Sequence, residues 1–178
     1  ERLPTQVEQP LLSRGLVAHY PDGSSVARGS AGLLYLRDRR AHTIQLPPDA
    51  GLVEIVRSAI RLLHADPFGC AIVSPKRVAF VRANTVSYLE APQVAGRMVG
   101  DIVSAHRYGG RLAVVTDETE DSEGASELWW TADGRTWSEP SAVVLNGGRA
   151  LASSEGPYGS LVVGLREGKR VSACAAFI

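Results

Sequence analysis

The chain has 178 residues, of which 44% are hydrophobic and 21% charged, enough to enclose one or two apolar cores. Its 19 basic and 19 acidic residues cancel, which removes the basic face on which binding to nucleic acid or anionic membranes depends. No apolar run reaches the roughly 18 residues of a membrane-spanning helix. We therefore expect a globular protein without nucleic-acid or membrane partners, cytoplasmic, or secreted if a leader has been removed.

A short signature recurs along the chain and sets the expected fold class. A Pro-aromatic-Gly turn precedes an apolar strand at residues 67–73 and again at 157–163, and two looser copies complete the set. The glycines that open these strands are 37, 41 and 49 residues apart, namely Gly32, Gly69, Gly110 and Gly159. Periods of about 40 to 50 residues are typical of four-stranded propeller blades. The spacing predicts an all-β chain of about four blades, which either close a ring or belong to a larger propeller.

The ends of the chain differ in composition from its middle. Residues 1–10 are rich in proline and polar side chains, so we expect a linker or a loosely attached arm there. Residues 11–178 then form the propeller-like domain. The chain finishes on the apolar run 173–178, which is typical of an interior strand and predicts that the domain is part of a larger propeller.

The segment 52–64 supports two interpretations. At 100° per residue, its apolar side chains fall on one half of a helical wheel, with Asp49 as a possible cap and Pro67 as a terminator. Alignment with the later repeats instead predicts strands, including an inner strand over 58–63. We favour strands because of this repeat alignment and keep a single helix as the alternative. A helix here would weaken the propeller interpretation.

The second and third units each predict four strands. Alternating apolar residues and tight turns such as Pro75-Lys76 separate short strand-like runs. In the second unit the expected strands cover 58–63, 70–74, 77–82 and 85–89. In the third unit they cover 98–105, 111–116, 127–131 and 141–145. Asn146-Gly147 is a strong hairpin signal, and the acidic stretch 117–126 is expected to be a solvated loop.

The sharpest local motif lies between the third and fourth strands of the third unit. Asp133 can accept hydrogen bonds from backbone N–H groups across a turn, and Gly134 can adopt the positive φ that the turn requires. Trp137 can fold back onto the sheet, where its indole N–H needs an acceptor. The tryptophans just before the motif alternate across the strand, so one is expected in the core and the other at the rim. The residues of the motif are Thr131, Asp133, Gly134, Thr136 and Trp137.

This motif resembles the Asp box, the BNR repeat of sialidases and of many other propellers. The match covers only the turn and, more loosely, its blade, and it is one residue shorter between Asp133 and Trp137 than the longest form of the pattern. The resemblance implies a structural turn in a bacterial β-propeller and no particular activity. The arginine-rich composition also resembles the propeller components that accompany MoxR ATPase and von Willebrand A proteins in bacterial conflict systems.

No catalytic or metal-binding pattern stands out in the sequence. The four histidines lie far apart, although His64 and His106 occupy similar positions in their repeats, where packing is the first interpretation and a ligand ring the second. The Phe/Tyr-Arg-Ile-Pro motif that opens sialidases is absent, and no nucleophile elbow or phosphate loop is present. We therefore expect no catalytic residues, no cofactor and no metal.

These observations favour a non-enzymatic interaction module that binds a protein partner, which could be the remainder of the same propeller. Propellers present loops around a funnel, which suits such a role. The alternative is a glycan-binding or glycan-cleaving, sialidase-like propeller fragment. Further Asp boxes or the sialidase motif would favour that alternative.

Overall fold

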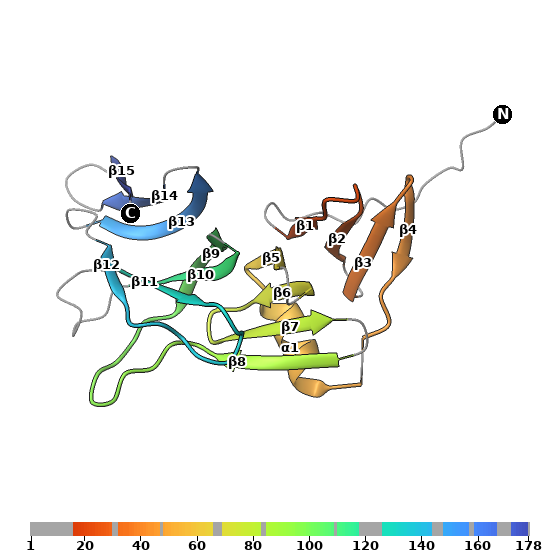
Figure 1. Ribbon diagram of the computed structural model, residues 1–178, viewed down its shortest axis with the longest axis horizontal. Coiled ribbons are helices and arrows are strands. Elements are labelled where there is room, and N and C mark those ends of the chain that lie inside the picture. The colour runs from red at the N-terminus through yellow and green to blue at the C-terminus, as the bar shows by residue number, and fades with distance from the viewer. Residues whose placement is uncertain are drawn as a thin grey trace.

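The described part of the chain is mostly β-strand with one α-helix, as the computed structural model shows (Figure 1). The all-β prediction is confirmed apart from that helix. The residues that the structure describes are 16–29, 32–46, 48–65, 69–82, 85–108, 110–117, 126–143, 148–156, 159–166 and 172–177. The expected arm over 1–10, most of the acidic loop and the Asn146-Gly147 turn lie outside these residues.

The described strands form four antiparallel sheets, in each of which every strand pairs with the next one along the chain. The first sheet contains β1 (Val17–His19), β2 (Ser25–Gly29), β3 (Gly32–Arg37) and β4 (Arg40–Thr43). The second contains β5 (Arg61–Ala65), β6 (Gly69–Val73), β7 (Arg77–Arg82) and β8 (Thr85–Glu90).

The third and fourth sheets continue the same up-and-down order. The third contains β9 (Ile102–Tyr108), β10 (Arg111–Thr116), β11 (Ser126–Thr131) and β12 (Ser141–Val143). The fourth contains β13 (Gly148–Gly156), β14 (Gly159–Arg166) and β15 (Ser172–Phe177). The strands predicted for the second and third units coincide with those observed at 77–82 and 111–116 and elsewhere have ends within four residues of them.

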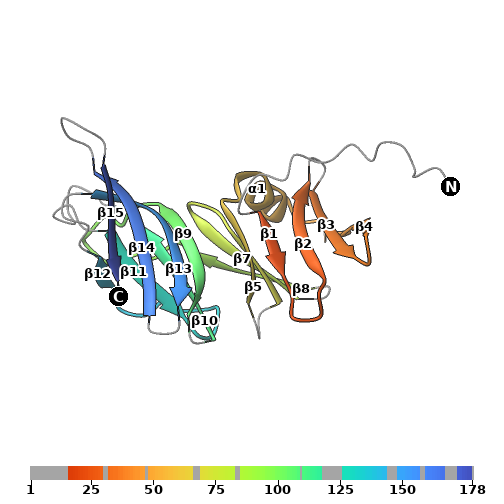
Figure 2. The ribbon, with the colours of Figure 1, turned by 90° about the horizontal axis from the view of Figure 1, so that it is seen from above.

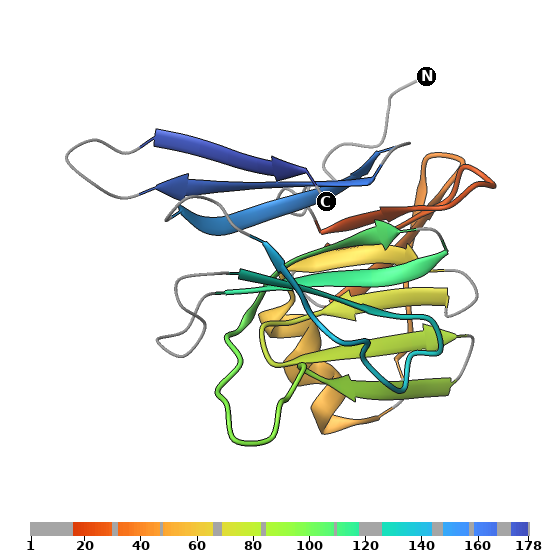
Figure 3. The same ribbon diagram turned by 60° about the vertical axis from the view of Figure 1, so that its left-hand side comes forward.

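The sheets follow one another in chain order through their first strands. β1 contacts β5, β5 contacts β9, and β9 contacts β13. The first and the last sheet lie at opposite ends of the molecule in two perpendicular views (Figures 1 and 2). A third view shows the second and third sheets face to face (Figure 3). The four sheets thus form an open series rather than a closed ring.

Alternate residues of the central strands pack into successive cores. On β6, Ile72 joins the core shared with the first sheet, whereas Ala71 and Val73 join the core shared with the third sheet. On β10, Val114 packs towards the second sheet and Val115 towards the fourth. Because successive side chains of a strand point to opposite faces, a strand that is apolar throughout must be covered on both sides.

The segment 52–64 divides into a helix and a strand, so the expectation of strands throughout was wrong for its first part. Helix α1 spans Ala50–Ser58, and its apolar pattern predicted three of its buried side chains, Leu52, Ile55 and Val56, whereas Val53 from the same half of the wheel is exposed. Asp49 caps it, because its Oδ1 accepts from the N–H groups of Gly51 (2.8 Å) and Leu52 (3.3 Å). Strand pairing resumes immediately afterwards, where the Ile60 N–H donates to the Val73 carbonyl at 2.8 Å.

The repeat was aligned wrongly in the first sheet. Gly69 and Gly110 mark the start of the second strands of their sheets, with φ of +82° and +77°. Gly32 instead opens a third strand, β3. The equivalent glycine is Gly23, which precedes the second strand β2 and has φ of +80°. The first spacing is therefore 46 residues, because α1 is inserted between the first and second sheets.

Candidate functional site

The turn after β11 is held by the side chains of its own residues. Asp133 Oδ1 accepts from the backbone N–H groups of Arg135 (2.8 Å) and Thr136 (3.0 Å), and Asp133 Oδ2 accepts from the Thr136 hydroxyl at 3.1 Å. The Gly134 N–H donates to Thr131 Oγ1 at 2.9 Å, and Gly134 has φ of +67°. Thr131 and Gly134 are buried, whereas Asp133 and Thr136 are exposed. Four of the five residues of the predicted motif therefore share one hydrogen-bonded turn, namely Thr131, Asp133, Gly134 and Thr136.

The charge of Asp133 is stabilised by this arrangement. Hydrogen bonds from the Arg135 and Thr136 N–H groups hold the pKa of Asp133 at about 2, below the usual value for aspartate. An ionised carboxylate accepts only, which matches the donors that the turn directs towards it. A pKa this low keeps the carboxylate ionised at neutral pH, where its hydrogen bonds stabilise the turn.

Trp137 connects the third sheet to the second. Its indole Nε1 donates to the Glu90 carbonyl at 2.7 Å, and its ring packs against the core between the two sheets. Trp129 is buried in the same core and donates to Thr116 Oγ1 at 3.2 Å, whereas Trp130 is half-buried. Trp130 packs on the opposite face of β11 against the core shared with the fourth sheet, so the predicted alternation is confirmed but the expected rim position is not.

A hollow of about 510 Å³ lies beside this contact, and we call it the Trp137 hollow. The half-buried Trp137 borders it together with backbone and polar groups, whereas Tyr88 is a lining residue whose ring packs against the core shared with the first sheet. Tyr88 is fixed in place because its hydroxyl donates to Asp49 Oδ2 at 2.6 Å and the Arg77 guanidinium lies 5.8 Å from its ring centre. The lining residues are Tyr88, Leu89, Glu90, Ala91, Gln93, Trp129, Arg135, Thr136, Trp137 and Ser138.

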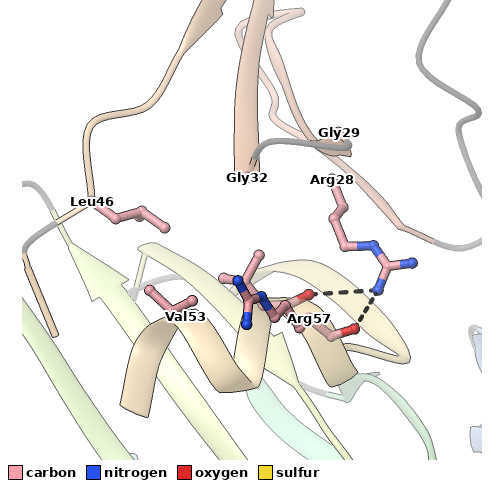
Figure 4. Close-up of a pocket in the computed structure, with 7 residues that line it drawn as sticks. Arg28, Gly29, Gly32, Leu46, Val53 and Arg57 are labelled. Atoms are coloured by element: carbon pink, nitrogen blue, oxygen red, sulfur yellow. Dashed lines mark hydrogen bonds between the residues drawn. The ribbon is translucent and has the colours of Figure 1, made fainter. Parts of the chain in front are cut away.

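A second hollow of about 420 Å³ lies between α1 and the β2–β3 hairpin, and we call it the α1 hollow (Figure 4). Arg28 Nη1 donates to carbonyl groups at the end of α1, those of Arg57 (3.1 Å), Ala59 (3.3 Å) and Val56 (3.5 Å). The lining residues are Arg28, Gly29, Gly32, Leu46, Val53, Val56 and Arg57.

His64, His106 and Cys70 occupy packing positions, whereas His19 and His42 are exposed. The His64 ring, on β5, lies 4.4 Å from the Tyr20 ring, and His106, on β9, is buried. Cys70 is a free, buried thiol whose pKa is raised to about 11 by burial. Within the described ranges, no three His, Cys, Asp or Glu side chains gather closely enough to hold a metal ion.

The last sheet presents apolar side chains on its outer face. Val162 on β14 is fully buried against the third sheet. Its neighbours Leu161 and Val163 point to the opposite face, where 42% and 37% of their surface is exposed. We call the surface formed by Leu161 and Val163 the end face.

Sequence reasoning did not single out the α1 hollow or the end face. A signal for the end face was present, because β14 is apolar at consecutive positions in the same way as β6 and β10. The α1 hollow had no local signal, since Arg28 and Arg57 are brought together only by the packing of α1 against the first sheet.

Comparison with protein-family models, with curated proteins and with solved structures finds no match for this chain. Within the described part of the chain, no helix combines the length and the apolar character needed to cross a membrane. The surfaces that bear on function are therefore the Trp137 hollow, the α1 hollow and the end face.

Proposed function

We propose that the chain is a run of four β-propeller blades that acts as a non-enzymatic interaction module for a protein partner. Two features support the propeller interpretation. The first strands of successive sheets contact one another in chain order, as inner strands of propeller blades do. The Thr131–Trp137 turn lies between the third and fourth strands of its sheet, the place that an Asp box occupies in a blade.

The end face is the observation that carries the proposed interaction. Three successive sheet-to-sheet contacts each bury one set of alternate apolar side chains and leave the other set for the next contact. Leu161 and Val163 are the set left over on β14. A sheet face of this kind is stabilised when another apolar sheet covers it. The partner is accordingly a further antiparallel sheet, from the same propeller or from a second protein.

Site-specific photo-crosslinking tests this role. A benzophenone amino acid is placed at Val163 and, as a control, at Val53, which is 44% exposed but lies on α1. We expect a cross-linked protein at position 163 only, with the attachment site in a strand of the partner. Equal labelling at both positions, or none at 163 in cells that produce the protein, would contradict the proposal.

The Trp137 hollow favours glycan binding as a second candidate function. The Trp137 ring beside guanidinium, amide and carbonyl groups suits a sugar, which has apolar ring faces and polar edges. Arg135 is exposed, and only its backbone N–H takes part in the turn, so Arg135→Ala leaves the turn hydrogen bonds in place. Titration of tryptophan fluorescence with oligosaccharides should show binding that this variant weakens and that Arg40→Ala, on the edge strand β4, leaves unchanged.

A further inference from the structure

The α1 hollow combines a charged group with an apolar wall. Leu46, Val53 and Val56 supply the apolar side chains, and Arg28 and Arg57 supply positive charge. No Asp or Glu belongs to the described residues that line it. Its volume of about 420 Å³ lies within the usual range for small-molecule sites, about 300–1,000 Å³.

Arg28 fixes the shape of the hollow. Its Nη1 is engaged by the carbonyl oxygens at the end of α1, which are the groups that a helix leaves without intrahelical partners. The positive charge of Arg28 also offsets the negative end of the helix dipole. Arg28 therefore holds α1 against β2. Its charge also offsets the negative electrostatic potential that the end of α1 would create at the hollow.

Arg57 is the group that can contact a ligand. Its side chain is exposed, and within the described residues its guanidinium has no hydrogen bond or ion pair. Figure 4 shows the Arg57 side chain lying over α1 between Val53 and Arg28. A guanidinium presents two parallel N–H groups that match the two oxygens of a carboxylate.

Val53 gives the hollow an exposed apolar surface. It is an apolar residue on the outer side of an otherwise amphipathic helix, with 44% of its surface exposed. Leu46 lies across the hollow from it in Figure 4. An alkyl group that covered these two side chains would remove apolar surface from water next to Arg57, which is favourable.

We propose that the α1 hollow binds a small organic carboxylate with a short alkyl chain. The carboxylate pairs with the Arg57 guanidinium, and the alkyl chain lies against Val53 and Leu46. The site is separate from the end face and does not depend on the proposed interaction with a protein partner.

Calorimetric titration with hexanoate tests this site, with acetate and hexanol as probes that lack the chain or the charge. We expect hexanoate to bind more tightly than either. Arg57→Gln should weaken hexanoate binding by about tenfold or more, since hydrogen bonds to charged groups contribute about 1.5–3 kcal/mol. The matched control is Arg40→Gln, the same change at an exposed position on β4, which should leave binding unchanged.

Val53→Asn distinguishes the alkyl contact from the carboxylate contact. It should weaken hexanoate binding and leave acetate binding unchanged, because only the apolar wall is altered. The proposal is overturned if hexanoate does not bind the folded wild-type chain, if Arg57→Gln binds it as tightly, or if hexanol binds equally well. Circular dichroism at 222 nm verifies that α1 is retained in each variant.

Discussion

At the scale of single residues, two glycines have backbone conformations that residues with a side chain rarely adopt. Gly69 and Gly110 start the second strands of neighbouring sheets with nearly the same positive φ. They differ in their surroundings, because a Cβ at Gly69 would lie 2.5 Å from the Val81 carbonyl oxygen, whereas a Cβ at Gly110 would meet nothing within 4 Å. The pair therefore separates backbone strain from steric conflict.

We expect Gly110→Ala to lower the free energy of unfolding by about 1–2 kcal/mol, the cost of a left-handed conformation for an L-residue. Gly69→Ala should lose that amount and a further ~1–3 kcal/mol, because its Cβ overpacks the β6–β7 pair. Urea unfolding of the two variants beside the wild type measures the difference. Equal losses would show that Val81 moves aside without cost.

The turn aspartate gives a second prediction at this scale. The pKa of Asp133 is lowered to about 2, so its folded-state hydrogen bonds contribute stability above its usual pKa and lose it as the pH falls towards 2. Asp133→Asn has no charge to lose and should have a flatter stability profile than the wild type between about pH 4 and pH 2. Thermal unfolding at intervals over this range gives both profiles, and parallel curves would contradict the assignment.

At the scale of elements, α1 joins the first sheet to the second. Arg28 from β2 holds its last carbonyl groups, and Tyr88 from β8 donates to its capping residue Asp49. The hydrogen bond from Tyr88 is the main reason that the pKa of Asp49 is lowered. The helix is thereby fixed at both ends by different sheets.

Tyr88→Phe should raise the pKa of Asp49 towards the usual value for aspartate while α1 persists, since Asp49 Oδ1 still accepts from Gly51 and Leu52. Because a lowered pKa contributes stability that is lost on acidification, the variant should lose less stability than the wild type as the pH falls. Carboxyl NMR titration measures this change. Asp22, whose pKa is lowered by Ser24, is an internal control that should not move.

Local patterns in the sequence predicted most strands but could not arrange them. Alternation and tight turns were enough for β6, β7 and β10, because each strand carries its own signal. They failed at α1, where the apolar residues fit both a helical and a strand pattern. They also failed at Gly32, which resembles the glycines of the repeat but opens the third strand of its sheet instead of the second. The contacts of Arg28 and Trp137 cross between sheets, so no local pattern predicts their partners.

At the scale of the whole molecule, the sheets depend on their neighbours for burial. The central strands are apolar on both faces, and the second and third sheets are covered on both sides. The fourth sheet is covered on the Val162 side and exposes Leu161 and Val163 on the other. In an assembly of this kind, an uncovered apolar face is the natural place for the next contact.

Size-exclusion chromatography with light scattering, on the wild type and on Leu161→Lys/Val163→Lys, tests the end face most directly. The two changes add charge to an exposed face and leave the buried Val162 side untouched, so both proteins should melt at similar temperatures. Because an uncovered apolar sheet face also associates with a copy of itself when no other partner is present, we predict that the wild type exceeds its 19.0 kDa monomer mass as concentration rises, while the double variant stays monomeric. The same mass for both proteins at every concentration would contradict the end face as an interaction surface.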